Sequence, residues 1–453
     1  MIDKKTRQVK LWLVMVVAVV FWTIGTGFYR DLSAKSEEAY EELKVFSDVI
    51  ELIEREYVDE VDTKDLIQKA IQGMVHSLDP HSSLLPMDAF EDLQIDTKGK
   101  FTGIGIHITM QDGFVTVISP IEDTPAYNAG IQARDRIIKV DGKPAKDLRE
   151  AVNMMRGPKG SKVNVTILRE GVKKPLEFEL VRDVIPIQSV KSIVIKPGYG
   201  FIRLSNFTGT TTAEMKKALE KMETAKIPLK GLVLDLRNNG GGLLNQSIKV
   251  ADLFLDEGTI LSIKGRNPKN TKVFNASPSN AKRSYPLVVL INGGSASASE
   301  IVAGALQDHK RALILGTTSF GKGSVQTVET LRDGAGLKLT IARYYTPSGN
   351  SIQAKGIQPD ILLKHRRLDA EEDQGREEGL LKEKDLANHL EAEPDDEADS
   401  DAESEKESQK KSKMREVDFR IGPLKTETLR SDNQVMRALE LLEGYEILKN
   451  LKS

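Results

Sequence analysis

Residues 286–300 read Pro286-Leu-Val-Val-Leu-Ile-Asn-Gly-Gly-Ser-Ala-Ser-Ala-Ser-Glu300. The apolar run Pro286 to Ile291 has the length and branched side chains of a buried strand, and an apolar helical pattern follows from Ser299. The small residues between them predict a sharp turn from strand to helix, beside backbone N–H groups that the first helical turn leaves unpaired. Ser297 stands at this turn, which suits a nucleophile.

The same alternation of strands and helices extends over residues 185–365. The strand at 286–291 is followed by a predicted helix over 299–309 and a predicted strand over 312–315. Alternation of this kind predicts right-handed βαβ units and an α/β core. Because 453 residues are too many for one ordinary core, we predict a multidomain α/β protein.

A serine nucleophile needs a base, and histidine is poorly supplied in this chain, which has only six. His309 is the nearest in sequence, but on the same predicted helix it would lie about 18 Å from Ser297. Lys322 can serve instead, because burial lowers the pKa of an amine and a neutral amine can accept the hydroxyl proton. If residues 321–326 are extended, Lys322, Ser324 and Gln326 share one face, where the Gln326 amide can orient the amine.

Two other interpretations of these segments stay open. Ser297 and Glu300 have the spacing of a capping box, in which the serine would only cap the helix. The segment from Gly316 to Lys322 comes close to a phosphate-binding loop, which would suggest a nucleotide-binding protein. Gly323, however, stands where that loop needs the Ser or Thr that holds magnesium.

Several segments together resemble the carboxyl-terminal processing peptidases, a family of Ser/Lys serine proteases. The similar segments are Ser295-Ala-Ser-Ala-Ser-Glu300, Phe320-Gly-Lys-Gly-Ser-Val-Gln326, Leu234-Asp-Leu-Arg-Asn-Asn-Gly-Gly-Gly242 and, at the edge of the expected cleft, Tyr344-Tyr-Thr-Pro-Ser-Gly349. The resemblance implies that Ser297 is the nucleophile, Lys322 the general base and Gln326 the residue that orients the base. No metal or organic cofactor is needed for this chemistry.

The glycine segment is where the resemblance implies an oxyanion hole. Its donors would be the N–H of Ala298 and one N–H of the Gly241-Gly242 turn, aimed at the charge that develops in the tetrahedral intermediate. The sequence does not choose between Gly241 and Gly242. Residues 231–237 have the pattern of a buried strand, so an ordinary turn between strand and helix is the alternative.

Upstream, Phe101-Thr-Gly-Ile-Gly-Ile106 opens a stretch, ending near Val184, that is similar to the PDZ domains of this family. PDZ domains add a ligand strand to a sheet edge and hold its terminal carboxylate in a nest of backbone N–H groups. The resemblance assigns that nest to Ile104, Gly105 and Ile106. Arg156 matches a position that couples peptide binding to the protease domain in relatives, and a solvated surface arginine is the alternative.

The N-terminus predicts export. An uncharged run from Leu11 to Tyr29 is about long enough to cross a bilayer, and four basic residues precede it, which predicts a cytoplasmic start. Because no Ala-x-Ala site follows closely, we expect an uncleaved signal anchor in a bacterial inner membrane, with the catalytic body facing the periplasm or the cell exterior. The chain has no cysteine, so disulfides are excluded.

Composition limits the partners. Charged residues make up 29% of the chain at a net charge of −2, so there is no basic footprint for nucleic acid. His76, Asp79 and His81 could suggest a metal site, but a helix end and a turn explain them better.

An amphipathic helix over Val435–Leu448 must bury its apolar face against the body or a second subunit. Terminal helices contribute to dimers in relatives, so we expect a homodimer, and the family leaves room for a lipoprotein adaptor.

These observations divide the chain into six regions. We predict a cytoplasmic start with signal anchor (1–35), an N-terminal helical region (36–96), a PDZ domain of α+β type (97–184), a Ser/Lys peptidase core (185–365), an acidic disordered linker (366–415) and a C-terminal helical region (416–453). The linker is predicted because residues 391–407 are acidic and lack aromatic side chains.

The predicted protein is a membrane-anchored envelope endopeptidase that recognises C-terminal protein tails and cleaves through an acyl-enzyme. The resemblance covers most of residues 41–360 and implies substrates with free, apolar C-termini. The alternative is a catalytically inactive PDZ scaffold or adaptor. Three polar residues at the spacing of Ser297, Lys322 and Gln326 argue against it, because a binding module has no need of them.

Overall fold

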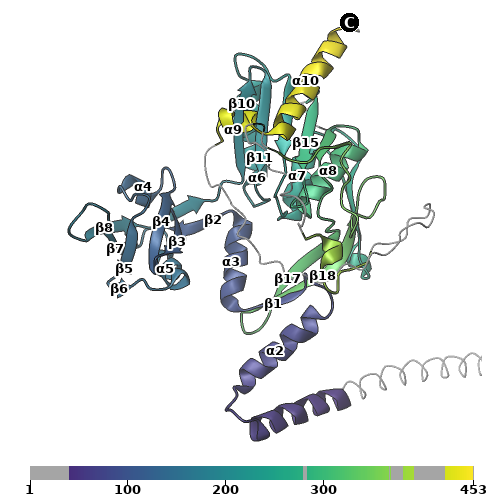
Figure 1. Ribbon diagram of the computed structural model, residues 1–453. Helices are drawn as coiled ribbons and strands as arrows, with labels where there is room; N and C mark the ends of the chain where they lie inside the picture. The colour runs from purple at the N-terminus through teal and green to yellow at the C-terminus, as the bar shows by residue number, and fades with distance from the viewer. Residues whose placement is uncertain (1–39, 279–282, 367, 369–380, 392–423, 452–453) are drawn as a thin grey trace, which may run out of the picture. The chain divides into compact units, whose positions relative to one another are not determined.

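The structure is a computed structural model that describes residues 40–278, 283–366, 368, 381–391 and 424–451 (Figure 1). The chain divides into two units, residues 1–75 and 76–453, which are described separately. The predicted anchor, residues 11–29, lies outside the described residues. No helix in the described ranges is long and apolar enough to cross a membrane.

The N-terminal region is helical, as predicted. One helix covers residues 40–56 and α2 covers Thr63–His76. After a turn come the short strand β1 (Ser83–Leu85) and α3 (Met87–Lys98), whose C-terminus is closed by Gly99 in a left-handed conformation. The strand β1 was not predicted from the sequence, and it pairs with a distant strand, β18 (Gly336–Tyr345).

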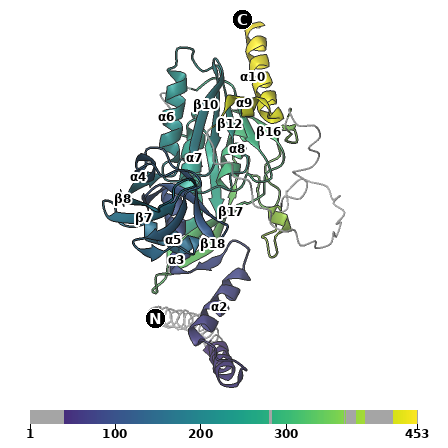
Figure 2. The ribbon, with the colours of Figure 1, turned by 60° about the vertical axis from the view of Figure 1, so that its left-hand side comes forward.

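The region predicted as a PDZ domain is a six-stranded antiparallel sheet with two helices (Figure 2). Its strands are β3 (Ile106–Gln111), β4 (Phe114–Pro120), β5 (Arg136–Val140), β6 (Lys143–Pro144), β7 (Lys162–Leu168) and β8 (Leu176–Val181), and its helices are α4 (Pro125–Asn128) and α5 (Leu148–Met155). Apolar residues of the strands, such as Val115, Ile137 and Val165, are fully buried in one core. The entering and leaving segments, β2 (Lys100–Gly103) and β9 (Asp183–Pro186), pair with each other.

The region predicted as the peptidase core, residues 185–365, is built on a second six-stranded sheet. Its order is β10 (Val190–Lys196), β11 (Tyr199–Leu204), β12 (Gly231–Asp235), β15 (Leu287–Ile291), β16 (Leu313–Gly316) and β19 (Ile361–Leu362). All pairs are parallel except β10 with β11. The predicted unit of strand, helix and strand is confirmed as β15, α8 (Ala298–Asp308) and β16. Every residue of β12 and β15 is buried, which explains their continuous apolar sequence.

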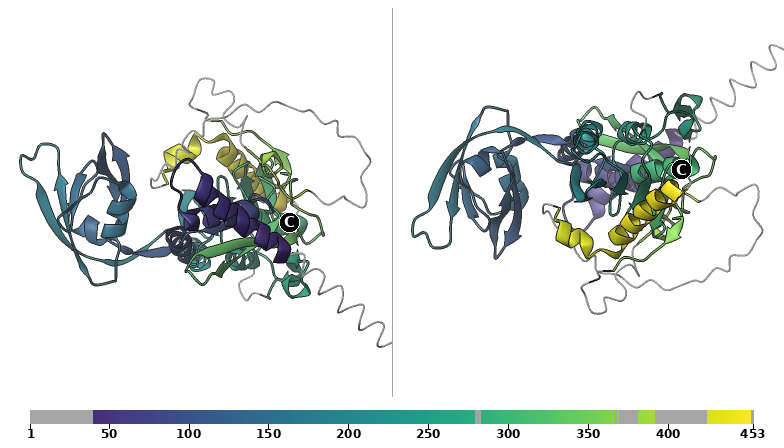
Figure 3. Two further views of the ribbon diagram at one scale, coloured as in Figure 1. Left: turned by 90° about the horizontal axis from the view of Figure 1, so that it is seen from below. Right: turned by 90° about the horizontal axis from the view of Figure 1, so that it is seen from above.

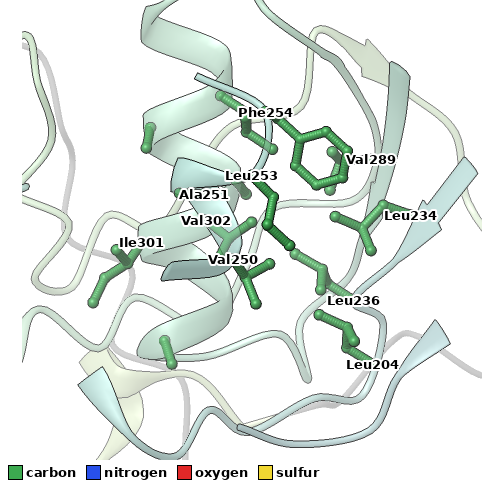
Figure 4. Packing of buried hydrophobic residues seen from close by; sticks show 14 of the residues in the cluster. Leu204, Leu234, Leu236, Val250, Ala251, Leu253, Phe254, Val289, Ile301 and Val302 are labelled. Atoms are coloured by element: carbon green, nitrogen blue, oxygen red, sulfur yellow. The ribbon is translucent and has the colours of Figure 1, made fainter. Parts of the chain in front are cut away.

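Helices cover both faces of this sheet. On one face, side chains of α7 (Leu244–Asp252) and α8 pack against the sheet, and Figure 4 shows Val250 and Val302 among Leu234, Leu236 and Val289. The same apolar cluster includes residues of α6 (Thr211–Glu223). The other face is covered by α9 (Thr426–Arg430) and α10 (Asn433–Leu451), shown in yellow in Figure 3. The predicted C-terminal helix is therefore confirmed, and the first part of α10 is buried against the body.

An antiparallel sheet completes the core. It holds β14 (Lys272–Asn275), β13 (Thr259–Lys264), β18 and β1, with β17 (Ser324–Thr330) also paired to β18. A short helical turn, η1 (Pro268–Asn270), joins β13 to β14. Within the range predicted as a linker, residues 381–391 have a described structure that includes a second turn, η2 (Glu383–Asp385). No sequence pattern predicted this segment.

Candidate active site

Ser297 lies in the turn that follows β15, immediately before α8, as the strand-turn-helix pattern predicted. Its φ of 56° is a conformation that residues other than glycine rarely adopt. The preceding residues fix the turn, because the Ser295 hydroxyl donates to the Leu236 carbonyl at 2.8 Å and the Ala296 N–H donates to the Asn239 carbonyl at 3.0 Å. The serine also occupies the N-cap position that the capping-box alternative gave it.

Glu300, in the first turn of α8, joins the serine loop to the lysine loop. Its Oε2 accepts the N–H groups of Ser297 at 2.7 Å and Lys322 at 3.0 Å. Its Oε1 accepts the Ser319 hydroxyl and the Gly321 N–H at 2.5 and 2.7 Å. Complete burial raises the pKa of this carboxyl to about 7, and the hydrogen bonds oppose the rise. One side chain therefore fixes the spacing of the two loops, a role that the capping-box pattern did not predict.

Lys322 lies in the loop before β17, which begins two residues later at Ser324, so the lysine is not part of the extended strand that we expected. Burial, together with the charge of the nearby Lys338, lowers the pKa of its amine to about 8. The carboxylates of Glu383, Asp79 and Glu300 act in the opposite direction. Among the described residues, no carboxylate comes within ion-pair distance of Nζ. With a pKa of about 8, a fraction of the Lys322 amine is neutral near pH 7.

Gln326 points to the same side as Ser324, as predicted, because its Nε2 donates to the Ser324 hydroxyl at 3.0 Å. The same Nε2 lies 3.3 Å from the Thr340 hydroxyl on β18. A register irregularity between Val325 and Gln326 accompanies this position. In the described part of the chain, no hydrogen bond joins Gln326 to Lys322, so its role as orienter stays a prediction.

Tyr344 contacts the backbone of Lys322 and lies near Ser297, and the sequence indicated it only as part of a cleft segment. Its side chain is almost fully buried on β18, and its hydroxyl donates to the Lys322 carbonyl. It also lies within hydrogen-bonding reach of the Ser297 hydroxyl. Burial and the charge of Glu300 hold the pKa of this phenol well above its usual value, so it remains a neutral donor.

The backbone around the glycine turn distinguishes the two candidate glycines. The Gly241 N–H donates to the Asn239 side chain at 2.9 Å, whereas the N–H groups of Gly242 and Ala298 find no acceptor among the described residues. Gly241 has a φ of 106°, and a Cβ there would lie 2.9 Å from the Ser297 Cβ. Only glycine therefore lets this turn approach the serine.

A network of ion pairs surrounds the buried Asp235, at the end of the strand that leads to the glycine turn. Asp235 at the end of β12 is fully buried and accepts from Arg203 and Arg237, and these guanidiniums hold its pKa low although burial opposes them. Arg237 in turn pairs with Asp432 at 2.9 Å and donates to Gln434 at the start of α10. The sequence indicated Asp235 and Arg237 only as part of a buried strand and of the glycine motif, and it did not indicate their ion pairs. The signal that could have found them is an acid and a base two residues apart in an apolar run.

The histidines have other partners. His309 Nε2 lies 2.7 Å from the Thr259 carbonyl at the far end of α8, so it does not serve Ser297, as expected. Asp79 accepts the N–H groups of His81 and Ser82 at 2.9 Å, which is the predicted turn. Across the described ranges, no cluster of His, Asp or Glu has the arrangement of a metal site.

The loop around Lys322 offers little to a phosphate. The N–H groups of Gly321 and Lys322 donate to Glu300, and that of Gly323 donates to the Gln353 side chain at 2.9 Å. A phosphate-binding loop needs such groups free to point at the ligand. The contacts therefore argue against the nucleotide-binding alternative.

The PDZ segment has the backbone expected of a carboxylate nest. Gly105 has a φ of 80°, and a Cβ there would lie 2.3 Å from Thr124. The carbonyls of Ile104 and Gly105 accept the N–H groups of Ala126 and Ile121, while their own N–H groups have no acceptor in the described part of the chain. Ile106 begins β3, which forms the edge of the sheet.

Arg156 is partly exposed and ion-paired, and its role in coupling peptide binding to the protease domain stays a prediction. Its guanidinium donates to Asp92 of α3 at 2.6 Å and lies 5.8 Å above the ring of Phe101. The side chain is about 30% exposed. Arg156, which directly follows α5, therefore links the end of that helix to α3.

Comparisons with known proteins agree on one family. The profile of peptidase family S41 matches residues 198–363, that of the PDZ domain matches 102–180, and that of the activating protease CtpB N-terminal domain matches 27–89. A carboxy-terminal-processing protease of Bartonella bacilliformis is 46% identical over 362 residues, which cover 77% of this chain and 83% of that protein. The carboxy-terminal processing protease CtpA of Bacillus subtilis is 36% identical over 366 residues, covering 78% and 77%.

Among solved structures, the photosystem II D1 C-terminal processing protease is similar to this chain. It is 33% identical, and the match covers 71% of this chain and 92% of that one, with a TM-score of 0.41.

Proposed function

The chain belongs to peptidase family S41, among the carboxy-terminal processing proteases that carry a PDZ domain, and on that premise we propose that it cleaves peptide bonds through an acyl-enzyme on Ser297. The observation that supports this most strongly is the pair of hydrogen bonds that the N–H groups of Ser297 and Lys322 donate to one carboxylate oxygen of Glu300. These bonds hold the proposed nucleophile and the proposed base within one small site.

In the proposed reaction, the neutral amine of Lys322 takes the proton of the Ser297 hydroxyl while the oxygen attacks the scissile carbonyl. The C–N bond of the intermediate then breaks, and the lysine returns the proton to the leaving amine. Water releases the acyl group in a second cycle of the same kind. Gln326 is proposed to orient the amine through Oε1, because its Nε2 already donates to Ser324.

We assign the oxyanion hole to the N–H groups of Gly242 and Ala298. Both lack an acceptor among the described residues, whereas the N–H of Gly241 is occupied by Asn239. Such donors lower the barrier only if they are free to point at the developing charge. The assignment chooses between the two glycines that the sequence left open.

The substrates of the protein can be identified by capturing them on an inactive variant. Ser297→Ala protein is expected to retain uncleaved proteins through the PDZ domain, and mass spectrometry of the captured material should find chains with apolar C-terminal residues. Those chains should be shortened when the wild-type protein is added. Capture without any cleavage by the wild-type protein would favour the scaffold alternative.

We propose that the PDZ domain binds the C-terminal carboxylate of a substrate at Ile104, Gly105 and Ile106. Amidating the C-terminus of a test peptide removes the negative charge, so affinity should fall by roughly tenfold and cleavage should slow with it. Fluorescence anisotropy and chromatography of the products measure the two effects. The matched control is a peptide with the same change at an internal glutamate.

The same pair of peptides can contradict the proposal. If a chain lacking residues 98–184 still distinguishes acid from amide, the carboxylate is read elsewhere. Equal cleavage of both peptides by the intact protein would return Gly105 to a purely structural role.

We propose that residues 11–29 anchor the protein in a bacterial inner membrane with its catalytic body outside the cytoplasm, on the basis of the uncharged run and the basic residues before it. The full chain should then stay with membranes during alkaline carbonate extraction, whereas a chain beginning at Ser36 should be extracted and active. Release of the full chain, or a mature N-terminus after residue 29, contradicts a permanent anchor.

The homodimer and the lipoprotein adaptor are also proposals. For the dimer, support comes from the end of α10, where Tyr445, Ile447 and Leu448 are exposed.

A further inference from the structure

Residues 381–391, which follow the peptidase core in sequence, lie against the loop that carries Lys322. The segment is lime green in Figures 1 and 2. The Glu383 N–H donates to the Phe320 carbonyl at 3.2 Å, two residues before the lysine. The carbonyl of Leu390 accepts from the Gln353 side chain at 3.0 Å. We call residues 381–391 the strap.

The strap inserts one carboxylate into the core. The Glu383 side chain has no exposed surface, although neighbouring Lys384 and Asp385 of the same turn are exposed. Its two oxygens lie 2.9 and 2.7 Å from His81 Nε2, and Oε1 also accepts from Gln353 at 2.9 Å. A buried carboxylate is costly unless it is hydrogen-bonded in this way, so its position needs an explanation beyond chain connection.

Hydrogen bonds connect Glu383 to the lysine loop both before and after Lys322. Gln353, itself fully buried, donates to Glu383 and accepts the N–H of Gly323 at 2.9 Å. Gly323 directly follows Lys322, and the Glu383 backbone holds Phe320 on the other side. The strap therefore clamps the lysine loop at two points, and neither point involves Ser297 or a residue of the oxyanion hole.

The charges around Glu383 come from several elements. His81 precedes β1, Lys322 belongs to the clamped loop, and the phenol of Tyr344 faces it from β18. Lys322 also feels Lys338 on β18 together with the carboxylates of Asp79 and Glu300. Hydrogen bonds from His81 and Gln353 outweigh burial and lower the pKa of Glu383, so it carries a negative charge at neutral pH. That charge opposes the effect of burial on the amine.

We propose that Glu383 is a positioning residue for Lys322, which holds the lysine loop through Gln353 and Phe320 and sets the charge beside the amine. The strap is then a part of the active site supplied by a segment outside the αβ core. The inference rests on the proposed role of Lys322 as base.

Two substitutions in the full chain test it. Glu383→Ala removes both the clamp and the charge, so kcat should fall about tenfold or more with KM within about twofold, because the substrate-binding surface is untouched. Glu383→Gln keeps the shape and most hydrogen bonds, so kcat above pH 9 should stay close to wild type. Loss of the negative charge should lower the pKa of Lys322, so the acid limb of the kcat profile should move to lower pH by about 0.5 to 1 unit.

The control is Asp385→Asn, which removes a charge from an exposed side chain of the same turn. This variant should change neither kcat nor the pH of the acid limb. Melting curves show whether each variant is folded at the assay temperature. If Glu383→Ala does not fold, Glu383→Gln decides alone. An acid limb that stays at the wild-type pH in a folded Glu383→Gln protein overturns the proposal.

Failure of the inference can be told from failure of the proposed mechanism. If Lys322→Met is inactive but Glu383→Gln behaves as wild type, only the strap proposal is wrong. If Lys322→Met is active, the lysine is not the base and the premise itself is wrong.

Discussion

Replacing Ser297 by alanine is expected to abolish peptide cleavage while the protein stays folded. The alanine lacks the oxygen that forms the acyl-enzyme, so kcat should fall by about 10³-fold or more. Stability should change little, because the contact between this loop and Glu300 uses the backbone N–H of residue 297, which alanine retains. A peptide-cleavage assay beside a melting curve measures both effects.

A second serine of the same loop provides the matched control. The Ser295 hydroxyl donates to the Leu236 carbonyl and accepts the Asn292 N–H, so Ser295→Ala should lower the melting temperature yet leave turnover measurable. If Ser297 were only an N-cap, its alanine variant would instead lose about 0.5–2 kcal/mol of stability and remain active. A destabilised but active Ser297→Ala protein contradicts the nucleophile assignment.

Removing the amine of Lys322 should have a similarly large effect. Lys322→Met has nearly the same shape but cannot accept a proton, so kcat should fall by about 10²- to 10⁴-fold. Lys322→Arg should be as inactive, because a guanidinium stays protonated at all accessible pH values. The measurement is kcat/KM with melting curves as the folding check, and wild-type turnover by either variant excludes the lysine as base.

The pKa of Lys322 determines whether the activity of the wild-type protein rises or falls with pH. The reactive form is the neutral amine, and with a pKa of about 8 roughly a tenth of Lys322 is neutral at pH 7. Activity should therefore rise as pH increases through about 8. Protonation of Glu300 near pH 7 should reduce activity further on the acid side, because a protonated carboxyl loses acceptor capacity for the two loops.

Lys338 provides a control for this assignment. Its positive charge lowers the pKa of Lys322, so Lys338→Met should raise that pKa and move the acid limb toward higher pH. The shift is opposite in direction to that expected for Glu383→Gln. A limb that stays in place in both variants would show that another group controls the profile.

Local patterns predicted the parts of the fold that depend on local sequence. The apolar run of β15 and the small residues before α8 indicated the serine turn, because burial on both faces of a parallel sheet requires a continuous apolar strand. The glycines at 241 and 105 were likewise informative, since both adopt positive φ in close contact with other residues. These features also carried the family resemblance.

The parts that were missed depend on contacts between distant residues. Glu300 looked like half of a capping box, and nothing local indicated that its carboxylate also reaches Ser319, Gly321 and Lys322. Glu383 lies in a polar range that periodicity describes as linker, yet it is buried beside His81. The position of Lys322 before β17 was missed because strand length cannot be read to the residue from alternation alone.

The most direct test of the central claim is to locate the adduct of a serine-directed fluorophosphonate probe by mass spectrometry of the wild-type protein. We expect one modified peptide, carrying the adduct on Ser297, with a labelling rate that rises through about pH 8 and is lost in Lys322→Met. Labelling of a different serine, or complete cleavage activity in protein whose Ser297 is fully modified, would contradict it.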